Sequence, residues 1–277
     1  MTKALVLGGG GVTGIAWHLG VLCGLQRAGS PLGGADTIVG TSAGSVVGTL
    51  LAAGVDLEEA VAGQRRVVAP RPSGGGGRNT GQFLAALAVL ADPSVPAQQA
   101  RAQVGAMALT APTTDEATYL SRMEPLIPVR DWPDRDLRLV VVDAADGRDL
   151  VLDRASGATL LQAVSASCAV PGLMPPVTIG DARYMDGGVR LGAGADLAAG
   201  ADHLVVIAPM AALSRDRIIA EMASTGAGKT LLIEPDEAAR EAFGPNFMDP
   251  SRRAAAAEAG LRQGATLAEA VRAVWPA

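Results

Sequence analysis

The sequence predicts an α/β fold with three layers, in which helices cover both faces of a mostly parallel central sheet. Near the N-terminus, short strand-like segments alternate with apolar helical segments, the order that parallel sheets require. Hydrophobic residues make up 49% of the 277 residues and charged residues 18%, enough apolar content for a large buried core. Only 3% of the residues are aromatic, so this core is expected to pack Ala, Val and Leu closely with abundant glycine.

The N-terminal elements are predicted from local patterning. Residues 3–7 (KALVL) and 37–40 (TIVG) are short, aliphatic or β-branched segments suited to buried strands. Each is followed by a predicted helix, over residues 14–28 and 43–54. The second helix is apolar on every side, which places it at the centre of the protein. Asp56 begins a further helix, to about residue 67, with a capping-box pattern.

Residues 70–124 are predicted to form an insertion into this fold. The stretch PRPSGGGGRNTG at residues 70–81 has the composition of a loop, and the Ala-rich sequence after it is helical in character with breaks at its prolines. Because four consecutive glycines leave the backbone unrestrained, limited proteolysis is expected first between residues 72 and 80. The insertion is expected to control access to a site.

The second half of the chain adds further strands and helices. Hairpins are predicted at residues 137–154 and 177–188, with a short helix at 158–168 between them. Buried strands are predicted at residues 203–209 and 229–235. Two C-terminal helices follow at about residues 250–275. The two helices are expected to begin at Ser251 and at Thr266. No internal repeat is visible, so residues 1–277 are predicted to form a single domain.

Composition and charge exclude several classes of function. The net charge of −5, without a basic run, argues against binding to nucleic acid and against a polybasic membrane anchor. Cys23 and Cys168 stand in apolar contexts and are expected to be buried thiols, and no metal site is predicted. No secretory signal pattern opens the chain, and no stretch has the roughly 18 apolar residues that a spanning helix needs. The prediction is a cytoplasmic protein without a transmembrane segment.

Glycine-rich motifs raise the alternative of nucleotide binding. Residues 9–14 fit G-x-G-x-x-G between a strand and a helix, as in an oxidoreductase that binds a dinucleotide. The acidic residue expected after the next strand is missing, and Asp36 lies at the wrong end of that strand. The motif STGAGKT at residues 224–230 has its helix and strand in the reverse of phosphate-loop order, and residues 74–79 follow no strand. The start of the helix after residues 9–14 nevertheless offers backbone N–H groups and a positive dipole end to an anion.

Ser42 stands in a G-x-S-x-G pattern between a predicted strand and a predicted helix. In a nucleophile elbow the serine sits on a strained turn with its side chain directed outward, and the residues two before and two after it are small because strand and helix nearly touch. Gly40 and Gly44 meet this requirement. The alternative is a serine that only caps the helix after it.

Three residues are candidates for the base that a serine nucleophile needs. The chain order Ser42, Asp186, His203 matches an α/β-hydrolase triad, but His203 precedes its strand and should lie at the edge of the sheet opposite the serine. His18 lies on the first predicted helix, which runs away from the serine turn. Asp186 is followed by two glycines that would let its side chain approach another turn, although an aspartate in a hairpin turn would also fit.

Three motifs in order, GGGVTG (9–14), GTSAG (40–44) and DGG (186–188), resemble those of the patatin-like phospholipase family. The flanking segments IAWHLGVL and SASCAVPGLMPPV also resemble this family, and the likeness covers about residues 3–210. The resemblance implies a patatin-like α/β/α fold and a catalytic dyad with Ser42 as nucleophile and Asp186 as base. It also implies an oxyanion hole formed by Gly9, Gly10, Gly11 and Val12. The glycines that support these motifs are Gly14, Gly40, Gly44, Gly187 and Gly188.

The implied chemistry is hydrolysis of lipid-type carboxylic esters through an acyl-enzyme, without a cofactor. The expected substrate is a lipid or another ester, which the protein could bind at a membrane surface. Thr13 departs from the family pattern, which usually has Arg or Lys at this position. A catalytically silent lipid-binding protein is therefore a further alternative.

Overall fold

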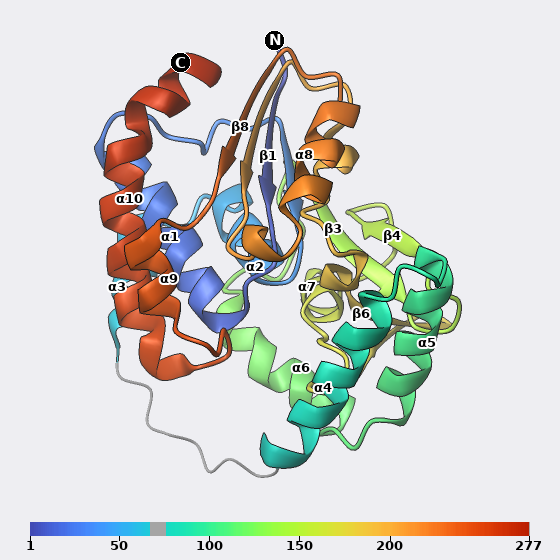
Figure 1. The fold of residues 1–277 in the computed structure, drawn as a ribbon. Helices are drawn as coiled ribbons and strands as arrows, with labels where there is room; N and C mark the ends of the chain where they lie inside the picture. The colour runs from blue at the N-terminus through green and yellow to red at the C-terminus, as the bar shows by residue number, and fades with distance from the viewer. Residues whose placement is uncertain (67–75, 277) are drawn as a thin grey trace. The chain divides into compact units, whose positions relative to one another are not determined.

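The computed structural model describes residues 1–66 and 76–276 of the chain (Figure 1). The chain consists of two compact units. The first unit contains both termini, and the second is formed by the middle of the chain. Their boundaries are Met1–Ala69, Pro133–Leu137 and Gly192–Ala277 for unit 1, and Pro70–Trp132 and Arg138–Leu191 for unit 2. Both units combine strands with helices, which confirms the predicted α/β class.

Unit 1 is built on four parallel strands in the order β2-β1-β7-β8. Their bounds are β1 Lys3–Leu7, β2 Thr37–Gly40, β7 His203–Ile207 and β8 Lys229–Ile233. Leu7 at the end of β1 is in register with Gly40 on one side and with Ile207 on the other. The carboxyl ends of these strands therefore meet at one edge of the sheet, where ligands bind in open parallel sheets.

Helices pack around the strands of unit 1. Their bounds are α1 Gly11–Arg27, α2 Ala43–Ala52, α3 Leu57–Arg65, α8 Arg215–Ser224, α9 Glu237–Phe243 and α10 Arg253–Val274, with short 3₁₀ turns at Ala195–Ala198, Ala211–Leu213 and Pro250–Arg252. In the view of Figure 1, α1, α9 and α10 lie together to the left of β1 and β8, and α8 lies to their right. Every residue of α2 is buried, as its apolar sequence predicts.

The C-terminal segment forms one long helix, so the prediction of two helices within residues 250–275 is wrong. Helix α10 runs without interruption from Arg253 to Val274. The Thr266 hydroxyl donates to the carbonyl of Gln263 within the helix and caps nothing. Ser251 lies in the preceding 3₁₀ turn, which is capped by the carboxylate of Asp249. A Ser or Thr inside a helix can satisfy its hydroxyl in this way, so it need not mark a start.

Helices α1 and α10 approach each other so closely that their contact requires glycine. A Cβ atom on Gly20 would overlap the carbonyl oxygen of Ala257, and one on Gly264 would overlap the carbonyl oxygen of Val21. Gly24 and Gly260 are placed in the same way against the facing backbone. Backbone therefore packs directly on backbone along this helix pair, which suits a core with few aromatic side chains.

The strands of unit 2 are antiparallel, so the strands of the protein as a whole are mixed. Strand β3 pairs with β4 and with β6, and β5 pairs with β6. Both predicted hairpins are thereby confirmed. The bounds are β3 Asp136–Asp143, whose first two residues belong to unit 1, β4 Asp149–Leu152, β5 Val177–Ile179 and β6 Ala182–Asp186.

The predicted insertion contributes most of the helices of unit 2. The bounds are α4 Gly76–Leu90, α5 Ala97–Thr110, α6 Glu116–Met123 and α7 Leu160–Ser167, with 3₁₀ turns at Glu124–Leu126 and Gly187–Arg190. The loop predicted at residues 70–81 is corrected from residue 76 onward, because these residues begin α4. A helix with a packed body extends through residues of low propensity. The remainder of that loop, including part of the expected cleavage region, lies outside the described residues.

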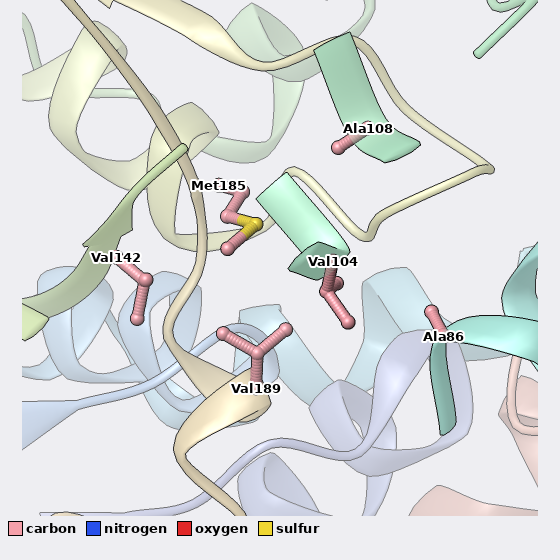
Figure 2. Close-up of a cluster of buried hydrophobic side chains, with 6 residues drawn as sticks. All are labelled: Ala86, Val104, Ala108, Val142, Met185 and Val189. Carbon is pink, nitrogen blue, oxygen red and sulfur yellow. The ribbon is translucent and has the colours of Figure 1, made fainter. Parts of the chain in front are cut away.

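A hydrophobic cluster joins the insertion to the strands of unit 2 (Figure 2). Ala86 on α4 and Val104 and Ala108 on α5 pack with three buried residues from the strand region, Val142, Met185 and Val189. Met185 directly precedes Asp186, so the insertion helps to position the end of β6.

Among residues 1–66 and 76–276, no helix is long and apolar enough to cross a membrane.

We expect Gly260→Ala to lower the free energy of unfolding by about 1–3 kcal/mol, because the added methyl meets the backbone of α1 and the helices must separate. Gly63→Ala is the matched control. Gly63 lies inside α3 with nothing within 4 Å of an added Cβ, so alanine there should raise stability by about 0.5–1 kcal/mol. Urea unfolding of both variants measures the difference. Equal effects would show that the α1–α10 contact tolerates side chains.

Candidate functional site

Ser42 lies on a strained turn at the carboxyl end of β2. Its backbone angles are φ 52° and ψ −117°, a conformation that residues other than glycine rarely adopt. The serine precedes the first residue of α2, yet its side chain makes no capping hydrogen bond to that helix. The alternative of a simple capping serine is therefore wrong. Backbone strain of this kind is typical of nucleophile elbows.

The glycines on both sides of Ser42 are required by close backbone contacts. A Cβ on Gly40 would lie 2.7 Å from the carbonyl oxygen of Gly44 and from the Cα of Ser45. A Cβ on Gly44 would overlap the carbonyl oxygen of Leu7, the last residue of β1. Only glycine fits at either position, so the small residues of the G-x-S-x-G pattern are required here by packing, as predicted.

The glycine loop that follows β1 lies beside the serine turn, within the same unit. A Cβ on Gly9 would lie 3.6 Å from the Cβ of Ser42, and one on Gly14 would lie 3.5 Å from the Cβ of Ala43. A Cβ on Gly10 would come within 2.7 Å of Pro209. The loop is thus held between the serine turn and the segment after β7.

The backbone amides of this loop differ in whether they are hydrogen bonded. The amides of Gly8, Thr13 and Gly14 donate to backbone carbonyls. Within residues 1–66 and 76–276, no hydrogen bond engages the N–H groups of Gly9, Gly10, Gly11 or Val12. The first amides of a helix carry the positive end of its dipole, so four donors beside Ser42 can stabilise negative charge.

Asp186 ends β6 in unit 2 and is fixed by backbone contacts. Its amide donates to the carbonyl of Ala169 at 3.0 Å, and its Oδ1 accepts from the amide of Gly188 at 2.7 Å. The side chain is buried. A Cβ on Gly187 would overlap the carbonyl oxygen of Val140, so the D-G-G sequence is also a packing requirement. The hairpin alternative is wrong, because Asp186 caps a 3₁₀ turn and the β5–β6 turn lies before Ala182.

The two halves of the expected dyad belong to different units. Ser42 and the loop from Gly9 to Val12 come together in unit 1, and Asp186 with Gly187 and Gly188 is organised in unit 2. Each group is positioned by the backbone of its own unit.

Comparison with known proteins decides the family. The family model described as "Patatin-like phospholipase" matches residues 5–199, which span both units and contain all three sequence motifs. The chain belongs to the patatin-like phospholipase family. This membership places it among the hydrolases of lipid esters. No curated protein matches the chain in sequence.

Two solved structures are similar over nearly the whole chain. One is VipD from Legionella pneumophila, with 16% identity and a TM-score of 0.49, covering 97% of this chain and 67% of VipD. The other is the type III effector protein ExoU, with 15% identity and a TM-score of 0.45, covering 98% of this chain and 53% of ExoU. The chain thus spans about half the length of ExoU.

The structure of this patatin-like protein excludes His203 as the base for Ser42. His203 begins β7 and is in register with Lys3, at the amino ends of the parallel strands. Ser42 follows the opposite, carboxyl ends, so the length of a strand, about 13 Å at 3.3 Å per residue, separates the two levels. The Nδ1 atom of His203 also lies 2.6 Å from the carbonyl oxygen of Val274. The α/β-hydrolase alternative is therefore wrong.

His18 is a buried structural residue of α1. Its Nε2 atom lies 3.1 Å from the carbonyl oxygen of Ile207 and hydrogen bonds to it. Burial lowers the pKa of His18 from 6.5 to about 4, because the charged ring would lose its hydration. The ring is therefore neutral at pH 7.

Thr13 occupies the position where the family usually has Arg or Lys, and it makes a different interaction. It is fully buried. Its amide donates to the carbonyl oxygen of Phe247 at 3.1 Å, and its hydroxyl donates to the same oxygen at 3.4 Å. Thr13 is thus bonded to a segment from the C-terminal part of unit 1.

The nucleotide-binding alternatives gain no support from the structure. The carboxylate of Asp36 accepts from the amide of Lys3 at 2.8 Å, at the amino end of β1 and away from the glycine loop. The motif STGAGKT joins the end of α8 to β8, in the order that the sequence predicts and opposite to that of a phosphate loop. Among the described residues, no group of acidic, His and Cys side chains could hold a metal ion.

Three features of the two units were not predicted from the sequence. The carboxylate of Glu221 accepts three amides, those of residues 193–195, and thereby fixes the chain just after unit 2 ends. Buried Tyr119 donates to the carbonyl of Ser165, and burial, with the nearby Cys168 and Asp186, raises its pKa. The third feature is the segment around Phe247. All three depend on residues far apart in sequence, and no local pattern could have indicated them.

We expect His18 to make stability depend on pH. Below pH 6.5 the unfolded chain protonates this residue, whereas the folded protein does so only near pH 4, so folding stability falls as pH drops through this window. The two pKa values imply a loss of roughly 3 kcal/mol between pH 7 and pH 4. Urea unfolding at several pH values should show a smaller loss for His18→Gln than for the wild type. Identical pH profiles would contradict this assignment.

Proposed function

We propose that this chain hydrolyses lipid-type carboxylic esters through an acyl-enzyme on Ser42, with Asp186 as the base. The observation that carries the proposal is the strained Ser42 turn beside the amides of Gly9 to Val12. A nucleophile and an anion-stabilising loop within one unit are the two parts that acyl transfer needs. Membership of the patatin-like phospholipase family supports the substrate class.

The proposed reaction has two stages. The Oγ of Ser42 attacks the ester carbonyl carbon as its proton passes to Asp186, and the resulting oxyanion accepts hydrogen bonds from the glycine-loop amides. The intermediate collapses to an acyl-enzyme, and the alcohol leaves with the proton from Asp186. Water then attacks the acyl-enzyme and gives one proton to Asp186. The second tetrahedral intermediate collapses to the carboxylic acid as Asp186 returns this proton to the Oγ of Ser42, which restores both residues. No cofactor takes part in these steps.

The supporting contacts fit these roles. The bond from the amide of Gly188 fixes the orientation of the Asp186 carboxylate, which matters because a carboxylate is a weak base and depends on geometry. The strained turn holds Ser42 beside the glycine loop, and its side chain makes no capping bond to α2. We also propose that the two units act as one catalytic domain, since the family match crosses both.

We expect Ser42→Ala and Asp186→Asn each to lower kcat for short-chain esters by at least about 10³-fold, with a double variant no worse than either. A fluorophosphonate probe should label the wild type and not Ser42→Ala. The controls are Ser156→Ala and Asp181→Asn, which change exposed residues of the same types. Circular dichroism should show all variants folded.

Two outcomes would overturn the proposal. Activity retained in Asp186→Asn would remove the dyad. Lipid binding without any turnover or labelling in the wild type would favour the silent lipid-binding alternative.

A further inference from the structure

The segment Gly244–Arg252 lies over the first turn of α1, beside the glycine loop. A Cβ on Gly11 would lie 2.7 Å from the carbonyl oxygen of Phe247 and 2.9 Å from the Sδ of Met248. Gly11 has φ 58° and is one of the four residues whose amides are proposed to form the oxyanion hole. The Met248 thioether therefore contacts this loop directly.

Aromatic packing and hydrogen bonds fix this segment in place. The ring of Trp17 on α1 stacks edge-on against Phe243 at 5.9 Å, and Phe243 contacts Phe247 at 5.6 Å. The carbonyl oxygen of Phe247 accepts both bonds from Thr13. At the far end, Arg252 donates to the carbonyl of Glu241 at 3.2 Å. The position of Met248 is therefore set by the fold on both sides.

The glycine loop connects Met248 to the serine turn. Gly9, two residues before Gly11, lies against Ser42, with 3.6 Å between an added Cβ and the serine Cβ. An ester carbonyl bound by the amides of Gly9 to Val12 lies beside Gly11, and a substituent that extends from it along the loop reaches Met248. That substituent meets a partly buried thioether, which is apolar and adapts its shape to a flexible chain.

We propose that Met248 forms one wall of the acyl-chain site and limits the length of acyl chain that this enzyme accepts. This inference rests on the proposed ester hydrolysis at Ser42. The wall lies outside residues 5–199, which match the family model, so it is supplied by the chain's own C-terminal part.

The test uses the full chain and p-nitrophenyl esters that differ only in the acyl group, from butanoyl to dodecanoyl. Each methylene excluded from an apolar site lowers kcat/KM about fourfold. Met248→Trp should therefore lower the ratio of kcat/KM for dodecanoyl over butanoyl by about tenfold or more, while butanoyl hydrolysis changes less than about threefold. Met248→Leu, of similar volume, should keep the ratio within about threefold. Ile219→Trp, at an exposed position on α8, is the control for a surface tryptophan.

The outcomes separate this inference from the proposed function. An unchanged ratio in folded Met248→Trp, with an active wild type, would overturn the acyl wall alone. The acyl wall would also be overturned if, in a series of butanoyl esters, Met248→Trp lowered kcat/KM more for longer alcohols than for shorter ones. If the wild type neither hydrolyses any ester nor reacts with fluorophosphonate, both proposals fail. Should Met248→Trp not fold, Met248→Phe should show the same direction with a smaller shift.

Discussion

The carbonyl oxygen of Leu7 occupies the space that any side chain at position 44 would need, and the geometry of the serine turn depends on this contact. It lets α2 begin directly against the end of β1, and it leaves Ser42 no relaxed backbone conformation. Strain of this kind costs about 1–3 kcal/mol and persists only where the surrounding structure enforces it. Here the enforcing structure is the buried helix α2, which packs against β1 and β2, so the energy that maintains the strained Ser42 turn comes from burial elsewhere in unit 1.

Close backbone contact of the same kind recurs at two other places in unit 1. Helices α1 and α10 meet through glycine, and the loop from Gly9 to Gly14 lies against Pro209 and the serine turn with no side chains between. With few aromatic residues to fill gaps, the protein achieves dense packing by bringing backbones close. Polar groups then need internal partners. The carboxylate of Glu221 illustrates this, since it takes three amides that would otherwise be buried without acceptors.

The sequence could predict what local pattern determines. Strands β1 and β2, the serine turn, both hairpins and the break between α8 and β8 follow from periodicity and glycine placement. The single C-terminal helix could not be predicted, because Thr266 resembles a helix start and only its bond to Gln263 shows otherwise. The start of α4 was missed because packing of its body outweighs its glycines. At the candidate site, the roles of Ser42 and Asp186 stay predictions, whereas the contact of Met248 with Gly11 joins residues more than 200 positions apart and leaves no local signal.

Thr13 shows how one residue type alters the electrostatics of the site. A cation there would add a full charge beside the start of α1, and burial would make that charge costly unless it were paired. Threonine instead gives its amide and hydroxyl to Phe247, which secures the segment that carries Met248. The loop amides and the dipole of α1 then supply positive potential at the glycine loop. Such fixed dipoles act over short range in a site shielded from water, so stabilisation of the proposed oxyanion should depend little on salt, unlike attraction of a distant charged head group.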